Sequence, residues 1–207
     1  MAGGRTTQLC SLPVHEWLQR LAGGVGYMLS AHHCDPSHGL VKSGGGTTIA
    51  NNSSSIDSMR VDPIASPATA PSIFYGPWNT TSLSTVKNWS SNSYGDRVCL
   101  SGATSGLRCG TIVDDATTAP GLSGNFYIRT KADSGWMSAG GDSGGPWYTG
   151  ASGGNQARGI HYGGETAVSC GAIAPDVSPS WGTCTQFSWY VPISVVLNTW
   201  GLALEVG

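Results

Sequence analysis

Gly and Pro interrupt this 207-residue sequence at short intervals and leave apolar runs of only four to seven residues between them. Segments that contain such runs include GVGYMLSA, GDRVCLSG, NFYIRT and FSWYVPI. Runs this short between turn-forming residues are typical of β-strands. Because only 11% of the residues are charged, Gly, Ser, Thr and Asn must cover much of the surface, which suits strands and turns better than long charged helices. The sequence therefore predicts an all-β fold.

The chain is long enough for two small barrels, and we expect two domains. An irregular stretch over residues 62–92, which holds four prolines, is expected to cross between residues 1–90 and residues 91–207. One segment near the end departs from the strand pattern. Behind Pro192, a residue suited to a first helical turn, apolar residues recur at helical spacing, namely Ile193, Val196, Leu197 and Trp200. We expect one helix there.

Charge gives no sign of a polyanionic partner. The formal net charge is -2, and neither sign forms a run, so we expect neither nucleic acid nor a membrane surface as a partner. The sequence has no run of 18 apolar residues, and its start, MAGGRTTQLC, lacks the basic and apolar regions of a secretory signal. We take Met1 to be the start codon of an expressed mature form.

Six cysteines, an even number, fit a disulfide framework and hence secretion into an oxidising compartment. None forms a C-x-x-C pair, so we expect no metal site and no cofactor. Nesting by nearest neighbours is one of fifteen possible connectivities. It gives the pairs Cys10–Cys34, Cys99–Cys109 and Cys170–Cys184.

The segment SAGGDSGGPWY, residues 138–148, surrounds Ser143 with four glycines. A serine hydroxyl becomes a useful nucleophile when a base takes its proton and when N–H donors stabilise the oxyanion that forms. Glycines let main-chain N–H groups reach that oxyanion, and we expect Gly141 and Ser143 to supply them. Gly144 and Gly145 leave room for the main chain of a substrate. The alternative is a Gly/Ser-rich turn without catalytic function.

The segment YMLSAHHCD supplies a candidate base, because an apolar strand ends there in two histidines beside a cysteine. A disulfide at Cys34 would fix the backbone of His33, which can offer one ring nitrogen to Ser143 while a carboxylate holds the other. We expect His32 to have only a structural role.

Asp57 is the candidate for that carboxylate. In SSIDSMRV it lies among the alternating apolar residues Ile56, Met59 and Val61, so we expect it to begin or lie within a strand with buried neighbours. Asp62, which precedes a proline, and Asp35, which is close to His33 in sequence, are competing candidates.

Three segments together resemble the chymotrypsin-like serine proteases of trypsin fold: SAHHC, the ID that precedes apolar residues, and GGDSGGP. VCLSGATSGLRCG further resembles the secreted bacterial streptogrisin and alpha-lytic type. The resemblance implies two antiparallel β-barrels with a site between them, and a triad of His33, Asp57 and Ser143 that hydrolyses peptide bonds through an acyl-enzyme. The order His, Asp, Ser excludes an α/β-hydrolase, in which the serine comes first.

The sequence departs from the family in how Asp142, beside the nucleophile, can be neutralised. The animal enzymes pair this aspartate with a new N-terminal ammonium, and the start of this chain offers no such residue. A buried unpaired carboxylate is costly, so we expect an arginine to pair with it, with Arg97, Arg108 and Arg129 as open candidates. The resemblance also implies a monomer and a pro-region that acts as folding aid and inhibitor.

The residues of the expected specificity pocket favour an acidic substrate side chain. Counted back from Ser143, the pocket base is Met137, where a substrate cation finds no partner. In ARGIHYGG, His161 resembles the pocket histidine of the glutamyl endopeptidases, and Ser138 takes the place of their hydroxyl residue. Both can donate charge-assisted hydrogen bonds to a carboxylate at acid to neutral pH, which predicts cleavage after Glu or Asp.

Two alternatives remain open at this point. His161 could satisfy a main-chain carbonyl while Met137 and Tyr162 form a pocket for apolar or aromatic side chains. In either case we expect Gly163 and Gly164 to pair with the substrate backbone. The chain could also be a catalytically silent, protease-shaped binding protein in which its eight tryptophans and seven tyrosines form a ligand face.

Overall fold

The computed structural model describes residues 18–20, 26–34, 47–63, 71–171 and 183–207. The first half contains β1 (Leu18–Arg20), β2 (Gly26–Ser30), the 3-10 turn η1 (His32–Cys34), β3 (Thr47–Ser53), β4 (Ser58–Pro63), β5 (Ser72–Phe74) and β6 (Leu83–Trp89). The second half contains β7 (Arg97–Gly102), β8 (Gly106–Thr117), β9 (Tyr127–Ala132), β10 (Ser138–Ala139), β11 (Pro146–Ala151), β12 (Gly154–Val168), β13 (Cys184–Pro192), α1 (Ile193–Trp200) and β14 (Ala203–Leu204).

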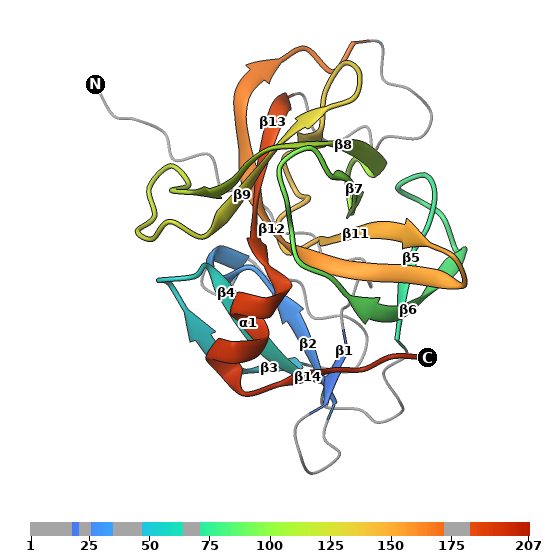
Figure 1. The fold of residues 1–207 in the computed structure, drawn as a ribbon, viewed down its shortest axis with the longest axis vertical. Helices are drawn as coiled ribbons and strands as arrows, with labels where there is room; N and C mark the ends of the chain where they lie inside the picture. Colours follow the sequence, from blue (N-terminus) through green and yellow to red (C-terminus); the bar gives the residue numbers. More distant parts are fainter. Residues whose placement is uncertain (1–17, 21–25, 35–46, 64–70, 172–182) are drawn as a thin grey trace.

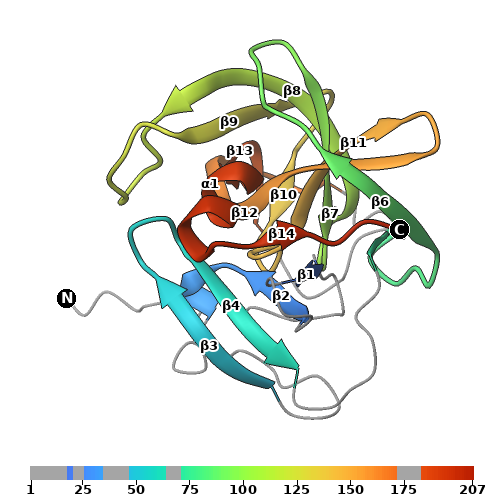
Figure 2. The ribbon, with the colours of Figure 1, turned by 60° about the horizontal axis from the view of Figure 1, so that its bottom comes forward.

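The strands form two sheets, seen as a smaller and a larger lobe in Figures 1 and 2. The smaller sheet has the order β14-β1-β2-β4-β3, and the larger has the order β10-β13-β9-β8-β7-β11-β12-β6-β5. Because β12 also pairs with β13, the six strands from β13 to β12 in this order close into a barrel. The predicted all-β fold with two barrels is confirmed, and so is the helix near the end of the chain.

The division between residues 1–90 and 91–207 stays a prediction, and the sheets divide the chain earlier. Strands β5 and β6 belong to the larger sheet, because β6 pairs in parallel with β12 and β5 pairs with β6. The first sheet therefore takes its strands from before residue 64, with β14 added from the end of the chain.

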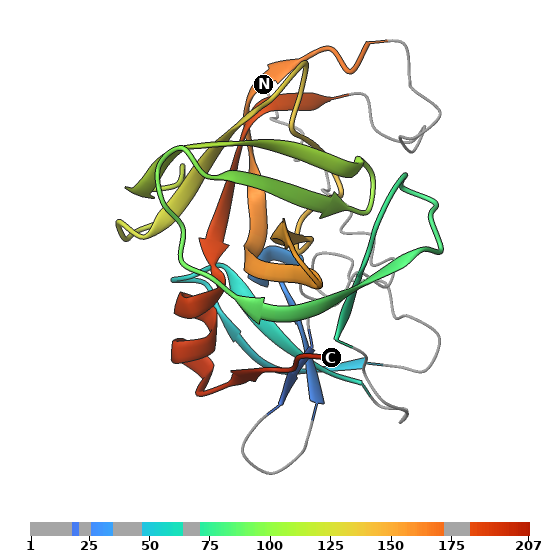
Figure 3. The same cartoon turned by 45° about the vertical axis from the view of Figure 1, so that its right-hand side comes forward.

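The C-terminal segment joins the two sheets. Helix α1 begins after Pro192 and ends at Gly201, whose left-handed backbone (φ +62°) turns the chain back. From the last helical residue, Trp200 donates a hydrogen bond from Nε1 to the Oγ of Ser58 in β4, at 3.0 Å. β14 then pairs with β1 (Figure 3). The end of the chain thus fixes the larger barrel against the sheet that carries the histidine turn.

Two clusters of buried apolar side chains form the core. The first extends across both sheets and includes Leu29, Ile56, Tyr127, Ile160 and Val196. The second fills the closed barrel with Val98, Leu100, Ile112, Ile128, Met137, Trp147 and Tyr190. Strands β7 and β13 each bury five consecutive residues, which explains why short apolar runs predict the strands well.

A buried arginine holds the start of β7 to the barrel. Arg158 in β12 is 5% exposed, and it donates to Asn92 Oδ1 at 3.0 Å, to Ser90 Oγ at 2.8 Å and to the carboxylate of Asp96. Arg97 also pairs with an aspartate, Asp133, but its side chain is 66% exposed. The two pairs differ mainly in burial.

Replacing Arg158 by Leu is expected to lower the free energy of unfolding by about 3 kcal/mol, because it removes a buried cation and leaves its partly buried acceptors without their donor. The matched change Arg97→Leu is expected to cost less than about 1 kcal/mol, because that pair is exposed to water. Urea unfolding in a Ser143→Ala background, which prevents self-digestion, measures both. Equal losses in the two variants would contradict the assignment of Arg158 as the buried anchor.

Candidate active site

The aspartate and histidine predicted to act together lie in contact. η1 follows β2 and places the Nδ1 atom of His33 2.8 Å from Oδ2 of Asp57, while the main-chain N–H of His33 donates to Oδ1 at 3.1 Å. Asp57 is 3% exposed and occupies the last position of the turn before β4, rather than the strand itself. Its φ of +42° is unusual for a residue with a side chain, so packing must hold this turn in place.

This contact determines which nitrogen of the histidine is free. An ionised carboxylate only accepts hydrogen bonds, so Nδ1 of His33 carries the proton and Nε2 keeps its lone pair. Nε2 is buried and makes no hydrogen bond within the described part of the chain. The ring is therefore prepared to act as a base. Of the competing carboxylates, Asp35 and the side chain of Asp62 lie outside the described residues.

The loop that carries Ser143 packs on the segment that carries His33. The sulfur of Cys34 lies 3.8 Å from the carbonyl oxygen of Ser143. A methyl group on Gly144 would overlap the hydroxyl of Ser30 and lie 3.1 Å from the main-chain nitrogen of Ala31. Only glycine permits this close approach, since Gly144 also has a φ of +83°.

The hydroxyl of Ser143 makes no hydrogen bond to His33 among the interactions of the described residues. Ser143 itself is 7% exposed. The third contact of the triad stays a prediction, although the loop packing places the two residues in one region.

The main-chain N–H groups around Ser143 fall into two sets. Those of Asp142, Gly144 and Gly145 each donate to a carbonyl, at 2.9 to 3.2 Å. Those of Gly141 and Ser143 make no hydrogen bond to the described residues. The two N–H groups predicted for the oxyanion hole are therefore the ones that internal bonding leaves available, and the φ of +94° at Gly141 is the conformation that glycine allows.

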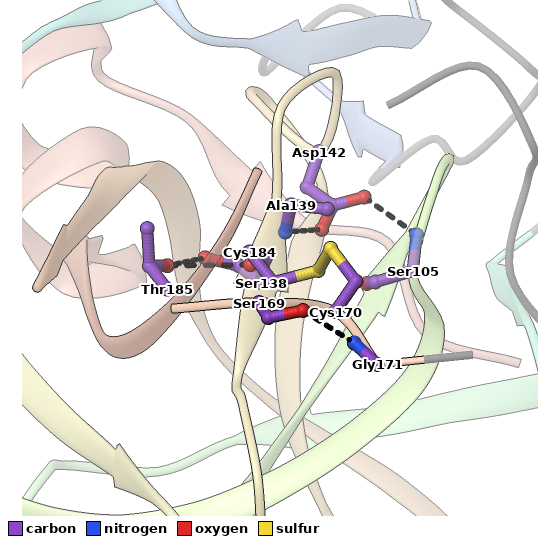
Figure 4. Close-up of a disulfide and its surroundings, with 9 residues drawn as sticks. All are labelled: Ser105, Ser138, Ala139, Asp142, Ser169, Cys170, Gly171, Cys184 and Thr185. Carbon is purple, nitrogen blue, oxygen red and sulfur yellow. Dashed lines mark hydrogen bonds between the residues drawn. A yellow bond between two sulfur atoms is a disulfide. The ribbon is translucent and has the colours of Figure 1, made fainter. Parts of the chain in front are cut away.

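Among the described residues, the carboxylate of Asp142 is stabilised by main-chain hydrogen bonds, and not by the cation that the sequence predicts. The carboxylate accepts main-chain N–H bonds from Thr104, Ser105 and Ala139 at 2.8 to 3.0 Å, and Figure 4 shows those from Ser105 and Ala139. Complete burial raises the pKa of Asp142, and these donors act in the opposite direction. The expected arginine is absent from the described contacts of this carboxylate.

The three candidate arginines are engaged elsewhere. Arg97 pairs with Asp133, Arg129 pairs with Glu165, and the guanidinium of Arg108 lies 4.1 Å from the centre of the Trp136 ring. The prediction of a cation beside Asp142 was wrong because main-chain donors replace it.

His161 is held as a neutral ring. It is 2% exposed, and its Nδ1 atom accepts a hydrogen bond from Nε1 of Trp147 at 3.3 Å. Burial, with His33 nearby, lowers the pKa of His161 to about 3. At neutral pH the ring of His161 is therefore uncharged in the free site, and it can offer a substrate carboxylate an N–H donor but no positive charge. Trp147 was not predicted, because only the β11–β12 pairing brings it to this position.

Ser138 belongs to a buried group of hydroxyls. Its Oγ atom lies 2.6 Å from that of Ser188 and 2.9 Å from Oγ1 of Thr185, which Figure 4 shows beside it. Both neighbours come from β13, which pairs with β10. Sequence analysis missed Thr185 and Ser188, since their spacing from Ser138 carries no motif.

The other predicted pocket residues occupy different surroundings. Met137 is fully buried in the core cluster of the closed barrel. Tyr162 packs against the other cluster, with its ring edge-on to His33 at 5.9 Å and its hydroxyl donating to the carbonyl of Pro120 at 2.7 Å. Met137 and Tyr162 therefore pack in separate cores.

Gly163 and Gly164 lie on a strand edge suited to a substrate backbone. They pair with Trp189 and Ser188 of β13 on one side. On the other side, the ladder to β11 ends at Ile160, so within the described chain the edge beyond it has no partner strand. Such an edge can add an extended peptide. A methyl group on Gly163 would meet nothing within 4 Å.

The predicted pairs Cys99–Cys109 and Cys170–Cys184 are both disulfides. Cys10, the predicted partner of Cys34, lies outside the described residues. Across the described ranges, no three His, Cys, Asp or Glu side chains gather as a metal site would require. No helix in the described ranges has the length and apolar character needed to span a membrane.

Several solved structures are similar to this protein over most of its length. No protein-family model matches the sequence. Thermobifida fusca protease A is similar, with a TM-score of 0.67 and 26% identity over 93% of this chain and 91% of that chain. Nocardiopsis protease has a TM-score of 0.62 and 23% identity, over 93% and 92%. A glutamic acid specific serine protease, said to use a histidine triad in substrate binding, has a TM-score of 0.66 and 21% identity over 91% of both chains.

These structures are bacterial chymotrypsin-like serine proteases. The chain has the chymotrypsin-like serine protease fold. The resemblance predicted from the three motifs is thereby confirmed, and the comparisons support a serine endopeptidase.

The depressed pKa of His161 predicts how stability depends on pH. Between pH 6.5 and about 3 the unfolded chain binds a proton that the folded chain refuses, so stability falls as the pH is lowered through this range. Replacing His161 by Gln is expected to remove up to about 1.4 kcal/mol per pH unit from that slope. Urea unfolding from pH 4 to pH 7 in a Ser143→Ala background measures it. Parallel curves for the two proteins would contradict a buried neutral ring.

Proposed function

We propose that this protein is a secreted serine endopeptidase that uses His33, Asp57 and Ser143. The observation that carries the proposal is the His33–Asp57 pair, whose unused Nε2 atom faces no internal partner while the Ser143 loop packs on the same segment. Such an arrangement would supply a base of fixed tautomer to the hydroxyl of Ser143.

The reaction would proceed in two stages. Nε2 of His33 takes the proton of Ser143 as Oγ attacks the substrate carbonyl, and the N–H groups of Gly141 and Ser143 stabilise the oxyanion. The protonated ring then gives its proton to the leaving amine, which departs and leaves an acyl-enzyme on Oγ. Water, deprotonated by the same nitrogen, attacks the ester; the acyl–Oγ bond breaks, the ring returns the proton to Oγ of Ser143, and the acid is released. Asp57 stabilises the charged ring throughout.

A silent binding protein is the alternative from another class. It would have no need for a buried carboxylate on the histidine or for two N–H groups without internal partners. Free polar groups of this kind are costly to a fold that does not use them. Their coincidence beside Ser143 favours catalysis.

Secretion is part of the proposal. Two disulfides, which form in oxidising compartments, support it. A pro-region and a monomeric state remain predictions of the resemblance, and the division into domains near residue 90 remains a prediction of the sequence.

We also propose that the enzyme cleaves after Glu or Asp. Hydrogen-bond donors support this preference: the neutral ring of His161 and the hydroxyls grouped around Ser138. The apolar alternative has less support, because Met137 and Tyr162 pack in separate clusters. The similar protease that is specific for glutamic acid is said to use a histidine triad, whereas His161 is the only histidine of this chain after position 38. Recognition of a Glu or Asp side chain by this protein would therefore need residues other than histidines around the ring of His161.

Replacing Ser143 by Ala is expected to abolish hydrolysis of casein and of a peptide ester. Replacing Asp57 by Asn is expected to lower kcat by roughly 10⁴-fold, because the carboxamide no longer selects the required tautomer. Ser93→Ala, at an exposed serine, is the matched control and should keep full activity. Survival of hydrolysis in Ser143→Ala would show that another residue is the nucleophile.

Peptides that differ only in the residue before the scissile bond test the preference. We expect kcat/KM for Glu to exceed that for Gln and Phe by at least tenfold, and His161→Gln to reduce this ratio while a Phe substrate is still cleaved. Mass spectrometry of a digested peptide library gives an independent measurement. Cuts mainly after Phe, Leu and Tyr would establish the apolar preference instead.

A further inference from the structure

The indole ring of Trp147 lies against His161 and offers it a hydrogen-bond donor. Trp147 lies in β11 with no exposed surface, and its Nε1 atom is 3.3 Å from Nδ1 of His161. An indole N–H is a donor and never an acceptor. The contact therefore requires a lone pair on Nδ1.

This requirement fixes the histidine in one of its three forms. A neutral imidazole with a lone pair on Nδ1 carries its proton on Nε2. The doubly protonated ring would direct an N–H of His161 at the N–H of Trp147, with no acceptor between them. The other neutral tautomer has the same conflict.

Further buried contacts hold Trp147 in its orientation. Its ring stacks on Tyr190 with centroids 4.6 Å apart and planes 20° apart. The Tyr190 hydroxyl donates to Oδ1 of Asn92 at 2.6 Å, and Arg158 donates to the same oxygen at 3.0 Å. The indole therefore cannot turn away without losing its stacking on a tyrosine that hydrogen bonds hold in place.

We propose that Trp147 is a positioning residue that locks His161 as the neutral Nε2–H tautomer, so that the specificity site offers an acidic substrate side chain an uncharged hydrogen-bond donor. This inference rests on the proposed preference for Glu or Asp. It assigns a chemical state to the site, and that state can be tested without a substrate.

The ionisable groups around His161 do not supply an alternative partner for Nδ1. His33, from η1, contributes after burial to the lowered pKa of His161 and is bonded through its own Nδ1 to Asp57. Tyr190 of β13 pairs in register with His161, but its hydroxyl is bound to Asn92. Asp142, in the loop that bonds to the main chain of His161, has its carboxylate occupied by main-chain donors.

An uncharged donor and a charged donor predict different pH profiles. The ratio of kcat/KM for Glu over Gln substrates cancels the titration of His33, since both substrates need it. With the locked tautomer the ratio stays constant from pH 6 to 9. With a cationic His161 of ordinary pKa it would fall roughly tenfold for each pH unit above 6.5.

The test combines this ratio with nitrogen NMR of His161 in the Ser143→Ala protein. We expect a single Nε2–H tautomer that does not titrate between pH 5 and 8. Trp147→Phe keeps an aromatic ring but removes the donor, and should allow both tautomers and make the Glu/Gln ratio depend on pH. Trp189→Phe is the matched control, because its buried Nε1 makes no hydrogen bond to the described residues and its loss should not change the tautomer.

The outcomes separate this inference from the proposed preference. A protonated or Nδ1–H ring in the Ser143→Ala protein overturns the tautomer lock, whatever the substrate preference. A locked ring in an enzyme that cleaves after Phe or Leu overturns the acidic preference and leaves Trp147 as the residue that sets the tautomer. If Trp147→Phe does not fold, the NMR measurement on the Ser143→Ala protein still decides.

Discussion

The double hydrogen bond from His33 to the buried carboxylate of Asp57 is the interaction on which the site depends. One bond comes from the ring and the other from the main chain, so the carboxylate fixes both the orientation of the imidazole and the turn that carries it. The backbone of Asp57 is in the left-handed region, which brings its side chain to this position. The residue after Asp57 is Ser58, whose hydroxyl accepts a hydrogen bond from Trp200 of the C-terminal helix. This bond helps to keep the turn in place.

Around this pair the molecule uses few charges. Asp142 is stabilised by three main-chain N–H groups, and His161 is kept neutral by a tryptophan. Main-chain dipoles in a dry interior interact strongly and need no counter-ion that must also be desolvated. Only 11% of the residues are charged, and in the site too, uncharged groups stabilise Asp142 and contact His161.

The larger barrel organises the remaining parts. Closure of β12 onto β13 brings His161 of one strand and Ser188 of the other to the same end as the Ser143 loop. That loop is bonded to β12 directly, because Gly144 donates to the carbonyl of His161 and His161 donates to that of Gly145. The proposed nucleophile and the proposed specificity residues therefore share one support.

Local patterns in the sequence predicted the strands, the helix behind Pro192 and two of the disulfides. They also predicted the His33–Asp57 contact, because each residue lies in a segment whose apolar neighbours determine its position. The partners of Asp142 were missed, since main-chain donors leave no trace in side-chain identity. Trp147, Thr185 and Ser188 were missed because strand register between distant segments, rather than spacing along the chain, brings them to the site.

The central claim is that His33 activates Ser143, and labelling with an organofluorophosphonate tests it most directly. Such a reagent reacts with an activated serine and leaves other serine hydroxyls unmodified. The account predicts one adduct per molecule, located on Ser143 by peptide mass spectrometry, and no adduct in a His33→Ala variant that is still folded. An adduct on another residue, or equal labelling with and without His33, would contradict it.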